Sequence, residues 1–220
     1  MANNPSFYFD VLYPFQDRVI RAINQADTGF YLTGGTAASR GYLQHRFSDD
    51  LDYFVNDEDH FGLWVERVIQ TLDKQWSCTV LTKEDRFARF NIIQEQVSLK
   101  IELINDVPAR VGAVQTHSIL GRLDSAENIL ANKVTALLDR EEPKDLADIW
   151  GFCCVKNLSL HAAITDAQSK AAGVFPADLG RVLCSVQKAD WESVRWIQAP
   201  PVEVFISQLT QLGEGLLLIK

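Results

Sequence analysis

The sequence predicts an α/β protein of the α+β type, with a lobe built on a small mixed sheet followed by a helical C-terminal lobe. Five short runs of apolar, branched and aromatic residues before residue 105 are typical of strands; they are residues 30–32, 51–55, 78–81, 87–93 and 97–104. From Asp124 onward the apolar residues recur with a helical period instead. This change places the lobe boundary within residues 110–123, so we expect lobes of residues 1–120 and 121–220.

Length and composition are those of a globular protein that can bury a core. The chain has 220 residues, of which 47% are hydrophobic and 23% charged. It shows no leader-like start and no run of eighteen apolar residues, so we expect a soluble cytoplasmic protein with no membrane segment. The four cysteines and four histidines have neither disulfide-framework nor zinc-ligand spacing, which favours buried thiols.

The charge balance is acidic throughout. The net charge is -8, with 11 basic against 16 acidic residues in residues 1–120, and 10 against 13 in the remainder. Nonspecific binding to duplex nucleic acid requires a broad basic face, and this acidic charge balance does not indicate one. A small basic pocket that contacts a few phosphates stays compatible with it, so RNA remains open as a substrate.

The first lobe is expected to begin with an amphipathic helix over residues 13–26. The strand at residues 30–32 then ends abruptly at Gly34-Gly35, and a second helix follows from Thr36 to Leu43. Free backbone N–H groups and the helix dipole at the start of that helix favour an anion. A further helix is predicted to end near Lys74, before the remaining strands.

Two carboxylates flank a single apolar residue where the strand at residues 51–55 begins. Asp50 and Asp52 should project to one face, because side chains alternate along a strand. Such a pair repels itself unless a cation lies between, and hard oxygen ligands suit Mg²⁺ or Mn²⁺. Residues 87–93 and 97–104 are predicted to form a hairpin near the end of the sheet, and its second arm carries Glu102 on the same face as Lys100.

The helical lobe is expected to open with a helix over residues 125–140, in which Lys133 flanks the apolar stripe. Pro143 suits the first turn of the next helix, where Asp145 and Asp148 are neighbours on one surface. Helical patterns recur near residues 158–172, 177–188 and 202–212, and no catalytic motif is recognisable among them.

Together these residues resemble the nucleotidyltransferase AbiEii/AbiGii toxin family, which comprises bacterial type IV toxins and abortive-infection proteins of the polymerase-β-like nucleotidyltransferase superfamily. The resemblance spans residues 30–150. It is carried by Gly34-Gly35-Thr36-Ala37, Tyr42, His45-Arg46, Ser48, Asp50 and Asp52, then by Lys133, Arg140 and Lys144-Asp145-Leu146-Ala147-Asp148.

The resemblance implies transfer of a nucleoside monophosphate from an NTP to an acceptor, with RNA or transfer RNA as the acceptor and a separately encoded antitoxin as the partner. Each residue type suits a step of that chemistry. The implied metal ligands are Asp50, Asp52 and Glu102, with Glu102 as ligand or base. The implied phosphate contacts are Gly34, Gly35, Thr36, Ser48, Arg46 and Lys133, and Asp145 is implied to be functional, with Asp148 beside it.

Other interpretations stay open at this point. The double-aspartate site also occurs in antibiotic nucleotidyltransferases, and the acidic surface suits a cationic small acceptor. A nucleotide-binding regulatory protein that has lost catalysis fits the same residues. Glu102 can equally be an exposed strand residue and Lys133 a snorkelling helix lysine, while Asp145 can serve the helix dipole alone.

Overall fold

The computed structural model describes residues 4–217, which group into two compact units. The first unit contains the described residues up to Ala37, residues 48–108 and residues 113–124. The second contains residues 38–47, residues 109–112 and the described residues from Ser125 onward. Neither unit is continuous in sequence, because two short segments that interrupt the first unit belong to the second.

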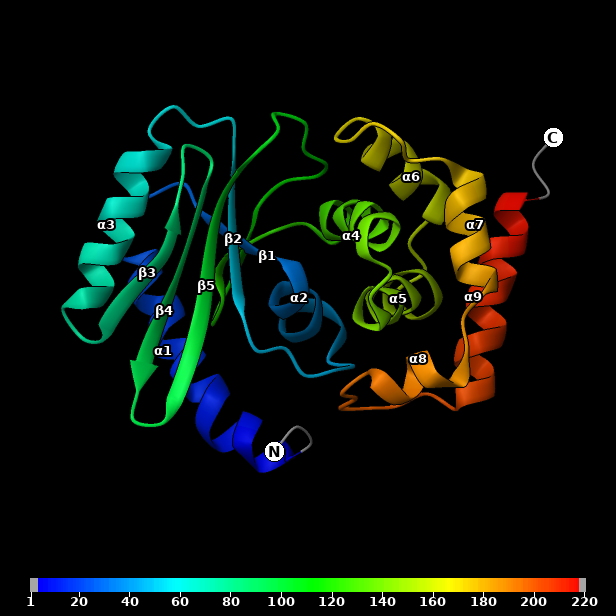
Figure 1. Ribbon diagram of the computed structural model, residues 1–220, viewed down its shortest axis with the longest axis horizontal. Helices are drawn as coiled ribbons and strands as arrows, with labels where there is room; N and C mark the ends of the chain where they lie inside the picture. The colour runs from blue at the N-terminus through cyan, green and yellow to red at the C-terminus, as the bar shows by residue number, and fades with distance from the viewer. Residues whose placement is uncertain (1–3, 218–220) are drawn as a thin grey trace. The chain divides into compact units, whose positions relative to one another are not determined.

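The first unit is built on a seven-stranded sheet with the strand order β3-β4-β5-β2-β1-β7-β6 (Figure 1). Two neighbouring pairs, β2 with β5 and β1 with β7, are parallel and the others are antiparallel, so the predicted mixed sheet is confirmed. The strands are β1 (Tyr31–Thr33), β2 (Leu51–Asn56), β3 (Ser77–Lys83), β4 (Phe87–Gln94), β5 (Val97–Asp106), β6 (Gln115–His117) and β7 (Gly121–Leu123).

Helices α1 (Tyr13–Asn24) and α3 (Phe61–Asp73) cover one face of this sheet (Figure 1). The π-helical segment η1 (Phe7–Leu12) leads into α1. Burial alternates strictly along β2 and through most of β5. Leu51 on β2 and Ile101 on β5 are fully buried, whereas every second side chain along each of these strands is partly or fully exposed. The sheet therefore has an apolar face under the helices and a polar face, as the predicted alternation requires.

The sequence prediction of this unit was wrong in two details. Strands β6 and β7 lie in the stretch where the sequence indicated only a lobe boundary. The prediction missed them because strands of three residues are too short to show a period. The predicted hairpin is β4 and β5, but β5 lies inside the sheet between β4 and β2, not near its end. The parallel pairing with β2, which the local pattern cannot show, makes it an interior strand.

The second unit is helical apart from an isolated bridge between Arg46 and Trp196. Its first long helix begins after Ser125, whose hydroxyl accepts the Asn128 N–H as an N-cap. Pro143 opens the following helix, as predicted. The helices are α4 (Ala126–Arg140), α5 (Pro143–Trp150) with its π-helical continuation η3 (Gly151–Val155), α6 (Leu160–Gln168), α7 (Pro176–Cys184), α8 (Lys188–Ser193) and α9 (Val202–Leu217).

Two further expectations concern the thiols and the membrane. The four cysteines are free, but each is partly exposed where the sequence predicted burial. Desolvation nevertheless raises the pKa of Cys153 to about 12, which keeps that thiol protonated. None of the helices described between residues 4 and 217 has both the length and the apolar character needed to cross a bilayer.

Candidate functional site

The three predicted carboxylates lie on the polar face of the sheet in the first unit. Asp52 on β2 is the register partner of Glu102 on the parallel strand β5 and of Thr33 on the antiparallel strand β1. Asp50 directly precedes β2, two residues before Asp52, and so projects to the same face. Side chains that are 50 residues apart in sequence are thus neighbours across one strand pair.

The glycine turn borders Asp52 directly. Strand β1 ends at Thr33, and the helical segments α2 (Gly34–Thr36) and η2 (Ala37–Leu43) follow without a loop. Gly34 has a φ of 66°, in the left-handed region. A Cβ atom at Gly34 would lie 2.2 Å from Oδ2 of Asp52. Glycine is therefore required at this position both by the backbone and by the carboxylate that lies against it.

We expect Gly34→Ala to lower the free energy of unfolding by about 1–3 kcal/mol, because alanine is strained in the left-handed region and its methyl group must displace Asp52. A melting temperature lower by roughly 5 °C would report this. Gly62→Ala is the matched control, since no atom lies within 4 Å of its added methyl group and it is the second residue of α3. The control is expected to be neutral or stabilising; equal melting temperatures for both variants would contradict the steric argument.

Two basic side chains that the sequence did not predict as site residues lie among the carboxylates. Lys100 Nζ is 2.9 Å from Asp50 Oδ2 and 3.2 Å from Glu102 Oε1. Arg89 donates from Nε to Glu102 Oε1 over 2.8 Å. Burial alone lowers the pKa of Lys100, but its hydrogen bond to Asp50 and the charge of Glu102 outweigh burial and raise it. The alternation along β5 was a signal for Lys100, whereas Arg89 depends on the register between β4 and β5.

The donor set suits a divalent cation in its chemistry. Carboxylate oxygens are the ligands that Mg²⁺ and Mn²⁺ prefer, and an ammonium group already lies as a cation between Asp50 and Glu102. In the described part of the chain, no three His, Cys, Asp or Glu side chains converge as metal ligands would. The three carboxylates thus share one sheet face without converging as a ligand set, and two of them contact Lys100.

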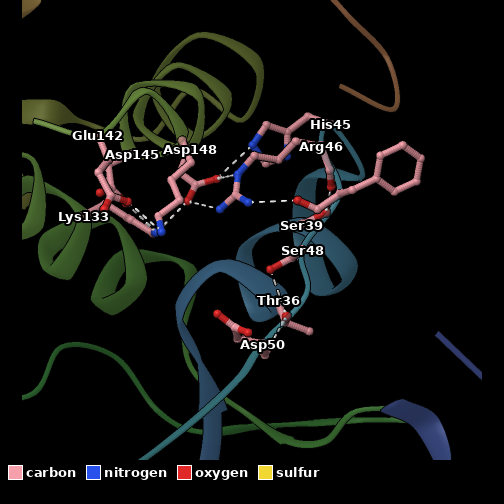
Figure 2. A network of polar contacts seen from close by, with 12 residues as sticks. Thr36, Ser39, His45, Arg46, Ser48, Asp50, Lys133, Glu142, Asp145 and Asp148 are labelled. Atoms are coloured by element: carbon pink, nitrogen blue, oxygen red, sulfur yellow. Dashed lines mark hydrogen bonds and ion pairs between the residues drawn. The ribbon is translucent and has the colours of Figure 1, made fainter. Parts of the chain in front are cut away.

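The hydroxyl groups predicted to contact phosphate join the glycine turn to the segment that carries Asp50. Thr36 is fully buried, donates from Oγ1 to the carbonyl of Asp50, and lies 3.0 Å from Ser48 Oγ (Figure 2). Gln16 of α1 donates to the carbonyl of Asp49 over 2.8 Å. The Thr36 bonds hold α2 against the residues that precede β2, and the Gln16 bond holds the same residues against α1.

The second unit contains a buried charge cluster around two aspartates of α5 (Figure 2). Asp148 accepts two hydrogen bonds of 2.7 Å from Arg46, one at each carboxylate oxygen, and its Oδ1 lies 3.0 Å from Nε2 of His45. Lys133 Nζ lies 2.7 Å from both Asp145 Oδ1 and Asp148 Oδ2. Both aspartates are 0% exposed.

This cluster brings together three predicted site residues, Arg46, Lys133 and Asp145, and gives Asp148 more partners than the sequence indicated. Arg140 also donates to Asp145, over 2.8 Å from its Nε. The interpretation of Lys133 as a snorkelling lysine is wrong, because its side chain is buried and paired with two carboxylates. The cluster joins residues 38–47 to α4 and α5 within the second unit.

Burial and the basic partners act in opposite directions on the pKa values of these carboxyls. Burial raises the pKa of Asp148, but the charges of Arg46 and Lys133 and the hydrogen bond from His45 outweigh it, so the pKa lies well below its usual range. The pKa of Asp145 is lowered in the same way, with Lys133 the main partner acting against burial. Burial lowers the pKa of His45, an effect that its hydrogen bond to Asp148 offsets only in part.

These shifts predict that stability falls with decreasing pH in two windows. Because the pKa of His45 is lowered by folding, the unfolded state binds a proton before the folded state does as pH falls below about 6.5, and stability is lost down to the folded pKa, by at most about 1.4 kcal/mol per pH unit. The depressed pKa values of Asp145 and Asp148 stabilise the fold above about pH 4, and this contribution is lost as pH falls through the folded values.

Melting temperatures measured between about pH 8 and pH 5.5 test the upper window. We expect His45→Gln, whose amide can still donate to Asp148, to flatten the decline that the wild type shows. His161→Gln removes an exposed imidazole on α6 and should keep the wild-type slope. A His45→Gln variant with an unchanged slope would contradict the assignment to His45.

The family model described as "Nucleotidyl transferase AbiEii toxin, Type IV TA system" matches residues 18–168. JHP933 from Helicobacter pylori has a similar structure, with a TM-score of 0.64 and 21% identity over 92% of this chain and 90% of that one. A candidate nucleotidyltransferase from H. pylori gives a TM-score of 0.63 and 20% identity over 92% and 93% of the two chains. Curated proteins give no match.

Proposed function

The chain belongs to the AbiEii nucleotidyltransferase toxin family of type IV toxin–antitoxin systems, and we propose that it transfers a nucleoside monophosphate from an NTP to an acceptor hydroxyl in a metal-dependent reaction. The observation that carries the proposal is the carboxylate row on the sheet: Asp52 and Glu102 are register partners, Asp50 is one pleat away, and the Gly34 turn lies against Asp52. Pyrophosphate is the other product.

In the proposed reaction the acceptor oxygen forms a bond to the α-phosphorus, and the bond from that phosphorus to the bridging oxygen of pyrophosphate breaks. A bound Mg²⁺ or Mn²⁺ would neutralise triphosphate charge and stabilise the attacking and leaving oxygens. Asp50 and Asp52 would hold that ion. Glu102, oriented by Arg89, would complete the ligand set or accept the proton of the acceptor hydroxyl.

The glycine turn is proposed to contact the phosphates. The backbone N–H groups of Gly34 and Gly35 stand at the start of a helical segment, where an anion is favoured. Thr36 and Ser48 are proposed to position this turn beside the start of β2, because their hydroxyls are hydrogen-bonded within the protein. Their contribution would be geometric, which matters where small displacements reduce the rate.

Arg46, Lys133 and Asp145 are assigned by family resemblance to the triphosphate and to catalysis. Their ion pairs in the second unit support a positioning role in the conformation described, since Arg46 and Lys133 are already bound to Asp148. We propose that the cluster keeps residues 38–47 in a fixed position on α4 and α5. A direct contact of Lys133 with phosphate would require its pair with Asp148 to open.

The proposed acceptor is RNA, with transfer RNA included, and the proposed partner is a separately encoded antitoxin, as the toxin–antitoxin family implies. The test uses the full chain, each α-labelled NTP in turn and total RNA, with Mg²⁺ or with EDTA. We expect label on RNA with at least one NTP in Mg²⁺ and none in EDTA. Pyrophosphate release that depends on an added aminoglycoside, without RNA label, would instead identify a small-molecule enzyme.

A third result would favour a regulatory protein. Stabilisation by NTP and Mg²⁺ in a thermal shift, without pyrophosphate release under any of these conditions, would mean nucleotide binding without transfer. The same result would exclude both enzyme interpretations for this chain.

A further inference from the structure

Lys100 lies beside two of the three carboxylates on the polar face of the sheet. Its register position on β5 is opposite Asp50, because the next pairs along the two strands are Leu51 with Ile101 and Asp52 with Glu102. Its Nζ atom lies 2.9 Å from Asp50 Oδ2 and 3.2 Å from Glu102 Oε1. One ammonium group thus bridges two carboxylates that are proposed to hold the metal, one directly before β2 and one on β5.

The local charge is nearly balanced by protein groups. Asp50, Asp52 and Glu102 contribute three negative charges, and Lys100 and Arg89 contribute two positive charges at salt-bridge distance. Like charges at this spacing repel, so the counter-ions Lys100 and Arg89 stabilise the row of carboxylates. A divalent cation that entered beside Lys100 would be repelled by the ammonium group, because Asp50 and Glu102 already have that group as their counter-ion.

Lys100 can leave this position without disturbing the core. Its side chain is 37% exposed, and it shares the polar face of β5 with Glu102. The flexible four-carbon stem of lysine lets the ammonium group move into water while the backbone stays in the sheet. Arg89 contacts Glu102 alone of these three carboxylates, and its guanidinium lies over the Phe87 ring, 5.1 Å from the ring centroid.

We propose that Lys100 is a built-in counter-ion that competes with the divalent metal for Asp50 and Glu102 and is displaced when the metal binds. This inference rests on the proposed metal-dependent function and adds to it a residue that sets how tightly the metal is held. Lys100 holds Asp50 and Glu102 together in the metal-free protein. The metal therefore binds more weakly than it would to three carboxylates without a counter-ion.

The test measures Mn²⁺ affinity of the full chain by the electron paramagnetic resonance signal of unbound Mn²⁺, without nucleotide. We expect Lys100→Gln to bind Mn²⁺ about tenfold more tightly than the wild type, because a charge-assisted pair no longer has to break. Lys100→Arg keeps the charge and should keep the wild-type affinity. Lys83→Gln is the matched control, because it removes one lysine charge from β3 of the same sheet and the salt-bridge partner of Lys83 is Glu66, not a proposed metal ligand; it should change the affinity by about threefold or less.

The outcomes separate this inference from the proposed function. If Lys100→Gln binds Mn²⁺ as the wild type does, while Asp52→Asn loses binding, the metal site stands and the counter-ion role is wrong. Unchanged Mn²⁺ affinity with weaker binding of a nonhydrolysable NTP would make Lys100 a phosphate ligand instead. If no form of the protein binds Mn²⁺, with or without that NTP, the metal-dependent function fails and the inference with it.

Discussion

Asp148→Asn is expected to lower the free energy of unfolding by about 3–5 kcal/mol, the usual cost of removing one member of a buried ion pair. Asp148 is 0% exposed, and it is the shared acceptor of Arg46, Lys133 and His45. Asparagine has nearly the same shape but no charge, so two buried cations lose a carboxylate. The loss arises from the charges left without compensation more than from the hydrogen bonds themselves.

The measurement is urea unfolding at neutral pH, supported by the melting temperature, which should fall by roughly 10 °C. Asp178→Asn is the control, because Asp178 forms an exposed pair with Arg181 three residues later on α7. Such a pair contributes at most about 1 kcal/mol. Similar stability losses in the two variants would show that the buried ion pairs of Asp148 stabilise the fold no more than an exposed pair does.

Asp52→Asn is expected to reduce nucleotidyl transfer about a thousandfold while the protein stays folded. The substitution removes one anionic oxygen ligand of the proposed metal. A metal stabilises the transition state by several kcal/mol, and each loss of about 1.4 kcal/mol lowers the rate tenfold. Asp52 is the residue that the Gly34 turn and Glu102 both border. It therefore lies where ligand and phosphate contacts are proposed to meet.

Initial rates with saturating NTP and Mg²⁺ give the comparison, and circular dichroism checks the fold. Asp59→Asn is the control, since Asp59 is exposed in the loop that follows β2 and should leave the rate unchanged. A variant at Asp52 that keeps a substantial part of the wild-type rate would remove Asp52 from the proposed metal site. Any nucleotidyl transfer by the wild type would then have to arise elsewhere in the chain.

Local patterns in the sequence were sufficient for much of the fold. Alternation predicted β2 and β5 and placed Lys100 and Glu102 on one face, because one side of the sheet is covered by helices. Helical periodicity predicted α4, and Pro143 marked the start of α5. Periodicity reports which face of an element is buried, and for these elements that was enough.

Pairings between residues that are distant in the chain could not be predicted from the sequence. Asp148 was expected on a helix surface, yet it is buried because Arg46, 102 residues earlier, meets it in the second unit. Residues 38–47 lie between two segments of the first unit and belong to the other. No local signal reports either fact, since both depend on which helices pack together after the chain has folded.

The sequence by itself determined that a glycine turn and an Asp-Leu-Asp strand start resemble the AbiEii family, and it offered Glu102 as a candidate third carboxylate on a strand. Only the tertiary structure decided which charges surround them: it paired Glu102 with Arg89, bridged Asp50 and Glu102 through Lys100, and enclosed Asp148 among three basic groups. The physical reason is that backbone alternation acts over two residues, whereas an ion pair needs partners that strand register and helix packing bring together from distant parts of the chain.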